Sequence, residues 1–142
     1  MDVLFFCRDG LYDSLISNLV LAMSLRKIGK EVAIIFSGGA LHDLCHGIIR
    51  YPDSLAGVEI RKTISVEAKS MGLPLQNSRD PKSLDIRPLL LQAKESGVSL
   101  YACPIWSILL KLSGKLPQEL SSIAMEKLLE EITSSTKIIG GF

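Results

Sequence analysis

The sequence lacks the features of a nucleic-acid-binding or membrane-spanning protein. Its 16 basic and 15 acidic residues leave a formal net charge of +1, and the basic residues form no block. Nucleic-acid binding relies on clustered basic residues to neutralise phosphates, so we expect none here. The longest uncharged stretch runs from Ser96 to Leu110 and is interrupted by Pro104. It is shorter than the roughly 18 apolar residues of a membrane span, so we expect no membrane-spanning segment.

Cysteine is scarce, and its spacing excludes two of its common uses. Cys7, Cys45 and Cys103 are odd in number and form no CxxC pair. The pattern therefore predicts neither a disulfide framework nor a zinc site. The first residues lack the basic leader and small-residue cleavage site of a secretory signal peptide. We expect a cytoplasmic protein, in which thiols stay reduced.

Apolar residues, by contrast, are abundant. They make up 47% of the 142 residues, and the mean hydropathy is +0.31. A chain of this length can form one domain with a sizeable core. It also carries more apolar surface than a small monomer easily buries, so we expect a homo-oligomer.

Short apolar runs separated by helical patterns predict an α/β fold. Strands are expected at residues 3–6, 32–36, 98–102 and 137–141. Helical spacing of apolar residues covers about 11–27, 41–49, 86–96, 104–112 and 117–133. Proline and glycine break up residues 51–85, where we expect an irregular surface excursion with at most a short helix before Gly72.

This order predicts one domain over residues 1–142. It should have three α/β/α layers, flavodoxin-like in their layering, around a mainly parallel sheet of about five strands. Sites in such sheets form beyond the carboxyl ends of the strands. We therefore expect Cys7, Asp9, Ser37, Gly38 and Cys103 to meet at one edge.

Cys103 is the strongest candidate for chemistry, because a proline follows it at a strand end. The residue before a proline is kept extended, and Pro104 suits the first position of a helix. Cys103 should then face the free N–H groups and positive dipole end of that helix, which stabilise a thiolate. Trp106 should shield one side of the site. The alternative is a buried, inert thiol, as many free cysteines are.

Two segments resemble the DsrE/DsrF-like family of small α/β sulfur-relay proteins. They are "DVLFFCRDGLYDSLISNLVLAMSLRKIGKEVAIIFSGGAL" and "LLLQAKESGVSLYACPIWSILLKLSG", and "TKIIGGF" fits the family's last strand. The resemblance covers nearly all of the chain except residues 51–80. It implies a DsrE-like fold, a trimer or hexamer, and sulfur donor and acceptor proteins as partners. It also implies a persulfide on the cysteine that falls at Cys103. We expect no cofactor.

Three hypotheses follow. The protein is a sulfur carrier or sulfurtransferase using Cys103, a thiol redox protein pairing Cys103 with Cys7 if their strands are neighbours, or a non-catalytic oligomeric binding module. His42 and His46 stand four residues apart, as metal ligands on one helix face do, but no third ligand is evident. We predict that they bind no metal.

Overall fold

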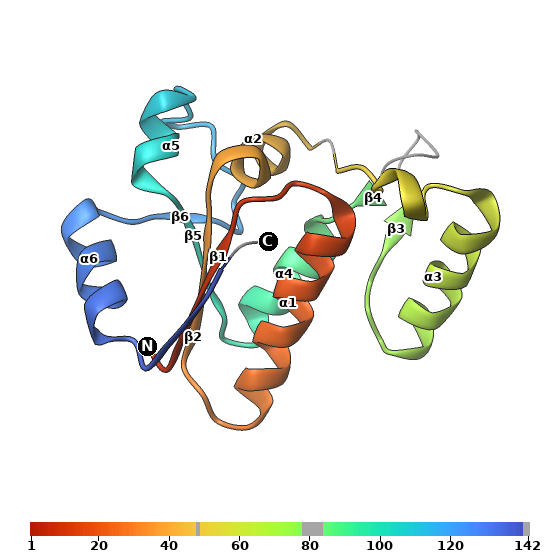
Figure 1. Cartoon of the computed structure of the whole chain (residues 1–142), viewed down its shortest axis with the longest axis horizontal. Coiled ribbons are helices and arrows are strands. Elements are labelled where there is room, and N and C mark those ends of the chain that lie inside the picture. The colour runs from red at the N-terminus through yellow and green to blue at the C-terminus, as the bar shows by residue number, and fades with distance from the viewer. Residues whose placement is uncertain (48, 78–83, 141–142) are drawn as a thin grey trace.

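A parallel β-sheet runs through the centre of the computed structural model, which describes residues 1–47, 49–77 and 84–140 (Figure 1). Within these residues the sheet has five strands in the order β6-β5-β2-β1-β7, and every neighbouring pair is parallel. The strands are β1 (Val3–Cys7), β2 (Val32–Phe36), β5 (Ser99–Ala102), β6 (Ser121–Ser122) and β7 (Lys137–Ile139). The predicted three-layer α/β/α fold is confirmed.

Helices cover both faces of the sheet. Figure 1 shows α1 (Tyr12–Lys27) and α4 (Arg87–Glu95) on one side and α6 (Met125–Ser134) on the other. Every residue of β2 is buried, as a central strand between two helical layers requires. The larger core lies on the α1 and α4 side. A smaller core on the α6 side is made of Leu4, Ala33, Ile35, Cys103, Ile123 and Leu128.

Two further helices lie at the edge of the sheet where the strands end. These are α2 (Gly38–His46), which follows β2, and α5 (Pro104–Leu109), which follows β5. Figure 1 shows them next to each other beyond the carboxyl ends of the strands. The helix expected at 41–49 begins earlier, directly after Ser37, and ends at His46, followed by Gly47, whose φ of 70° is left-handed. Ile48, part of the predicted apolar stripe, lies outside the described residues.

The fifth strand is one that the sequence did not reveal. We predicted a helix from Pro117 to about Thr133, but residues 117–120 form a turn and Ser121–Ser122 pair with Tyr101 and Ala102 of β5. Two serines have low strand propensity, which hid β6. The helix begins only at Met125. The last strand, expected at 137–141, ends at Ile139, and residue 141 lies outside the described residues.

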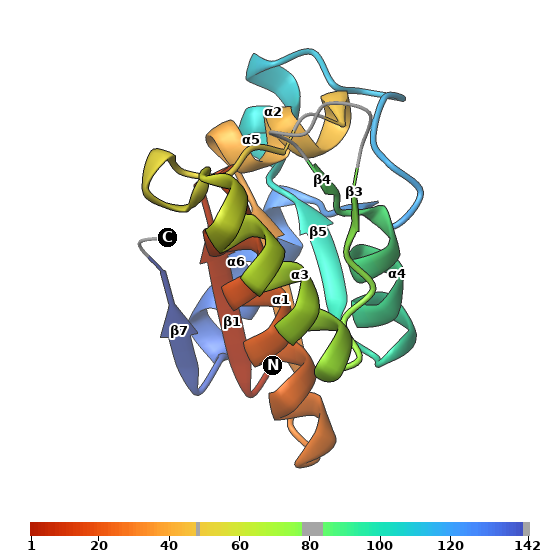
Figure 2. The same cartoon turned by 90° about the vertical axis from the view of Figure 1, so that its right-hand side faces the viewer.

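Residues 51–85 are more regular than we expected. They contain a short 3-10 helix (Asp53–Leu55), the 13-residue helix α3 (Val58–Ser70), and an antiparallel pair of β3 (Gln76–Asn77) with β4 (Leu84–Asp85). Figure 2 shows α3 outside α1, away from the sheet. Ala68 is the only residue of α3 that is buried. Most of the "NSRDPKS" stretch lies outside the described residues.

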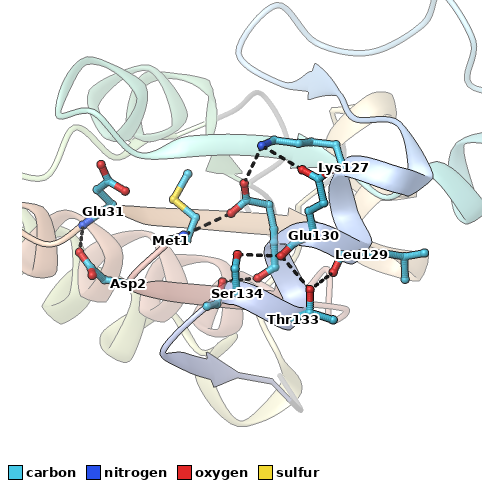
Figure 3. Close-up of polar contacts among 10 residues, drawn as sticks. Met1, Asp2, Glu31, Lys127, Leu129, Glu130, Thr133 and Ser134 are labelled. Carbon is cyan, nitrogen blue, oxygen red and sulfur yellow. Dashed lines mark hydrogen bonds and ion pairs between the residues drawn. The ribbon is translucent and has the colours of Figure 1, made fainter.

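Ion pairs along α6 connect it to the start of β1 (Figure 3). The ammonium group of Lys127 lies 3.2 Å from the Glu131 carboxylate and 3.6 Å from that of Glu130. The Met1 amine lies 3.3 Å from the same Glu131 carboxylate. Burial alone would raise the pKa of Glu131, but the hydrogen bonds from Lys127 and the amine outweigh it and lower that pKa.

In the part of the chain that the structure describes, none of the helices has both the length and the apolar character needed to cross a bilayer.

Candidate functional site

Three adjacent strands, β5, β2 and β1, bring the predicted site residues to one edge of the sheet. The residues that follow these strands directly are Cys103, Ser37 and Arg8. The Cys103 N–H donates to the Phe36 carbonyl at 2.9 Å, and the Ser37 N–H donates to the Cys7 carbonyl, also at 2.9 Å. These bonds continue the parallel ladder by one step, so the three positions are fixed side by side.

Cys103 occupies the N-cap position of α5, with Pro104 at the start of the helix, as the sequence predicts. Its side chain, however, makes no capping hydrogen bond to the helix N–H groups. It belongs instead to the small core on the α6 side and is 6% exposed. The pleat explains this placement, because Cys103 follows Ala102 on extended backbone and so points to the opposite face. The expected contact between thiol and helix N-terminus is therefore not what the structure shows.

The other two thiols are poor nucleophiles. Cys7 is fully buried in the larger core. Burial, helped by the nearby Asp9 carboxylate, raises the pKa of Cys7 to about 12. Cys45 packs partly buried against the same core, and burial raises its pKa as well. Neither thiol forms much thiolate at neutral pH, and the thiolate is the attacking form.

Cys7 and Cys103 are not positioned to form a disulfide. Their strands, β1 and β5, are both paired with β2 and so lie on either side of it. Neighbouring strands are about 4.8 Å apart, so the two residues are roughly 10 Å apart, beyond the roughly 7 Å between Cα atoms that a disulfide spans. They also belong to cores on opposite faces of the sheet. The two-cysteine redox hypothesis required the strands of Cys7 and Cys103 to be neighbours, and β1 and β5 are not.

The loop after β1 has a structural role in the described residues. The Asp9 carboxylate accepts a hydrogen bond from the Leu11 N–H at 2.7 Å, which is the turn that short acidic residues favour. Gly10 next to it lies against α2. A Cβ atom there would come within 2.2 Å of the Asp43 carboxylate and 2.9 Å of the Gly39 carbonyl oxygen, so only glycine fits.

Trp106 does not shield Cys103. It is not part of the small core around the thiol and is exposed on α5. Other large apolar side chains of this six-residue helix are also exposed, namely Ile105, Ile108 and Leu109. The helix thus presents an apolar surface to solvent next to the site.

His42 and His46 stack with their ring centroids 4.2 Å apart. The Nδ1 atom of His46 lies 2.7 Å from the His42 carbonyl oxygen, and Nδ1 of His42 lies 3.0 Å from the Asp43 carboxylate. Within residues 1–47, 49–77 and 84–140, no three His, Cys, Asp or Glu side chains are grouped as metal ligands would be. The prediction that this pair binds no metal remains to be tested.

A cavity of about 630 Å³ is lined by Ala102 and Pro104, the two neighbours of Cys103 in the chain, but not by Cys103 itself. Its other walls include Ser107 and Ile108 of α5 and Lys111 just after that helix. Lys111 has a φ of 53°, a left-handed conformation that is uncommon for a residue other than glycine. Sequence reasoning missed this cavity, because it predicted a helix over residues 104–112, whereas α5 ends at Leu109.

Comparison with solved structures supports the fold. The YchN protein from E. coli, a protein of DsrE-like fold, superposes with a TM-score of 0.63 at 14% sequence identity, covering 99% of both chains. A conserved protein of unknown function, BT1422 from Bacteroides thetaiotaomicron, gives a TM-score of 0.54 at 14% identity and covers 99% of this chain and 95% of its own. No known family model and no curated protein matches the sequence. At this identity the likeness is one of fold.

Proposed function

We propose that the protein is a sulfur carrier that holds a persulfide on Cys103. The observation that carries the proposal is the position of this thiol at the carboxyl end of β5, directly before a proline-initiated helix. Its two neighbours in the chain, Ala102 and Pro104, line a cavity. Ligands of open α/β sheets bind at this edge. The other two cysteines have raised pKa values, which leaves Cys103 as the candidate nucleophile. The DsrE-like fold of YchN and the resemblance in the sequence support the same assignment.

The chemistry is a thiol exchange that needs no external oxidant. The Cys103 thiolate attacks the outer sulfur of a persulfide donor, R–S–S⁻. A new S–S bond forms on Cys103, the donor's S–S bond breaks, and R–S⁻ leaves with the bonding electrons. A second thiolate, on an acceptor, then takes the outer sulfur from Cys103 in the same way.

Intact-mass measurement after incubation with a persulfide donor tests the proposal. We expect a gain of one sulfur atom that is lost in Cys103→Ser and retained in Cys45→Ser, the matched control. Reduction should remove the added sulfur. A wild-type protein that gains no sulfur from any persulfide or polysulfide donor would contradict the proposal.

A non-catalytic binding module is the second candidate, because two observations favour it. Cys103 is only 6% exposed, and α5 next to it is an exposed apolar helix. In this case α5 is a contact surface and the thiol only fills the small core. The mass measurement separates the two candidates, because a binding module takes up no sulfur. The assembly of a binding module would still depend on α5.

We also propose that the chain forms a homo-oligomer, a trimer or a multiple of three as the family resemblance implies. The exposed apolar residues of α5 support this, together with Met125 and Leu129 on α6, which are exposed as well. Light scattering gives the mass of the assembly directly, and a value of 15.5 kDa, that of the single chain, would contradict the proposal.

A further inference from the structure

The cavity next to α5 has the size and the lining of a small-molecule site. Its volume of about 630 Å³ falls within the roughly 300–1,000 Å³ of ligand pockets in proteins. Ala102 and Ser122, which line it, are the last residues of the parallel strands β5 and β6. The cavity therefore lies at the carboxyl edge of the sheet, where open α/β folds bind their ligands. Most of its wall is apolar and is made of Ala102, Pro104, Ile108, Leu112, Leu116 and Ile123.

The polar part of the wall offers hydrogen-bond donors and one positive charge. Among the described residues that line the cavity, only Lys111 is charged, and it is exposed. Its ammonium group makes no ion pair or hydrogen bond with any described residue. Ser113 and Ser122 also line the cavity, and their hydroxyls are exposed and not bonded to the described part of the chain. A cation and two hydroxyls beside an apolar wall suit a ligand that joins an apolar body to an anionic group.

The backbone of Lys111 is held in a conformation that favours glycine. The Lys111 N–H donates to the Ile108 carbonyl at 3.1 Å, and the Leu112 N–H donates to the Ser107 carbonyl at 2.9 Å. These two bonds form a Schellman motif, in which the residue just after the helix takes a left-handed conformation and is usually glycine. Lys111 has this position with a φ of 53°, so its Cβ atom costs folding free energy. Strain of this kind is typical of residues whose side chains serve a binding site.

We propose that this cavity binds a small amphiphilic anion. The apolar body of the ligand lies against the apolar wall, and its burial supplies most of the affinity. The anionic group lies at the exposed side of the cavity, where the Lys111 ammonium group and the hydroxyls of Ser113 and Ser122 hold it. Cys103 does not line the cavity, so the inference goes beyond the sulfur-carrier proposal and does not depend on it.

Calorimetric titration of the full chain with octanoate tests the role of the charge. Octanoate should bind the wild-type protein, whereas 1-octanol, which has the same chain length and no charge, should bind about tenfold more weakly. Lys111→Gly should weaken octanoate binding by a similar factor and leave 1-octanol binding unchanged. Lys111→Arg keeps the charge and should retain octanoate binding. Lys115→Gln is the matched control, because Lys115 is exposed nearby and does not line the cavity.

A second variant tests the location of the site. Ser122→Phe places a large side chain in the cavity at a strand position that tolerates aromatic residues. It should abolish binding of both octanoate and 1-octanol, and circular dichroism shows whether the variant is folded. Cys103→Ser should bind octanoate as the wild type does, so the site can be tested whether or not Cys103 carries sulfur.

Stability separates a lysine kept for binding from one kept for the fold. Because glycine relieves the left-handed strain, Lys111→Gly should raise the urea concentration at which half of the protein is unfolded. A lower midpoint would assign Lys111 to the fold and overturn the inference. So would a wild-type protein that binds no octanoate, a Lys111→Gly variant that binds it unchanged, or a folded Ser122→Phe variant that still binds it.

Discussion

Cys7 and Cys103 lie on opposite faces of the central sheet, and β2 separates their strands. This relationship predicts that mild oxidation with diamide leaves the pair unlinked within one chain, because a disulfide would require the backbone of β1 or β5 to move by several ångströms. Peptide mapping under non-reducing conditions is the measurement, in a Cys45→Ser background so that only these two thiols remain. A linked Cys7–Cys103 peptide from the monomeric fraction would restore the redox hypothesis.

The thiols should differ in their rates of alkylation. Iodoacetamide at neutral pH should label Cys103 first, Cys45 more slowly, and Cys7 only after denaturation. With a pKa of about 12, Cys7 is thiolate in only about one molecule in a thousand even at pH 9. Raising the pH from 7 to 9 should therefore increase labelling of Cys45 and leave Cys7 unlabelled. Mass spectrometry of the peptides gives the order, and a Cys103 that reacts only in denaturant would place it among the inert core residues.

The sequence predicted the parts of this fold that follow from burial. Uninterrupted apolar runs such as "VAIIF" become strands because parallel strands are covered on both faces. It missed β6, since Ser121 and Ser122 are held in the sheet by their partners on β5 and have no strand pattern of their own. Whether these two serines form a strand depends on their pairing with β5, which the local sequence does not show.

The same reasoning located the candidate site but not its orientation. Proline after Cys103 correctly indicated a strand end and a helix start. Which face the thiol takes depends on the register of the whole strand, and a shift of one residue reverses it. The sequence could therefore place Cys7 and Cys103 at one edge without showing that the sheet divides them.

Gly10 should be intolerant of a side chain. The Gly10→Ala Cβ atom would approach the Asp43 carboxylate, which can rotate away, and the Gly39 carbonyl oxygen, which belongs to the backbone of α2 and cannot. We expect a loss of about 1–3 kcal/mol in the free energy of unfolding, the usual cost of overpacking, measured by urea denaturation. Gly57→Ala is the control, since its nearest neighbour would be 3.9 Å away and its φ is −64°. Equal stability of Gly10→Ala and wild type would show that the loop moves freely from α2.

Acid should remove the stabilisation that Lys127 gives to α6. The pKa of Glu131 is lower in the folded protein than in the unfolded chain, so this carboxylate adds stability above its unfolded pKa and loses it as the pH falls through its folded pKa. Lys127→Gln should therefore be less stable than wild type at pH 7, and the difference should vanish at acidic pH. Thermal unfolding followed across pH measures this. Lys69→Gln, on α3, should show no such pH dependence, and a difference for Lys127→Gln that persists in acid would exclude the ion pair as its cause.

Assembly should depend on α5. Ile108 is 77% exposed at the end of this helix, and Leu109 follows it, so in the single chain both side chains are in contact with water. Burying such side chains between subunits gains roughly 25 cal/mol for each Å² of apolar surface, and charges at the same positions would have to be desolvated. We expect Ile108→Glu with Leu109→Glu to dissociate the oligomer, giving the 15.5 kDa chain by light scattering. Ile28→Glu is the matched control, because Ile28 is 69% exposed after the end of α1, far along the chain from α5, and its change should leave the assembly intact. If the double variant keeps the wild-type mass while remaining folded, the interface lies elsewhere on the surface, and the exposed face of α6 with Met125 and Leu129 becomes the next surface to change.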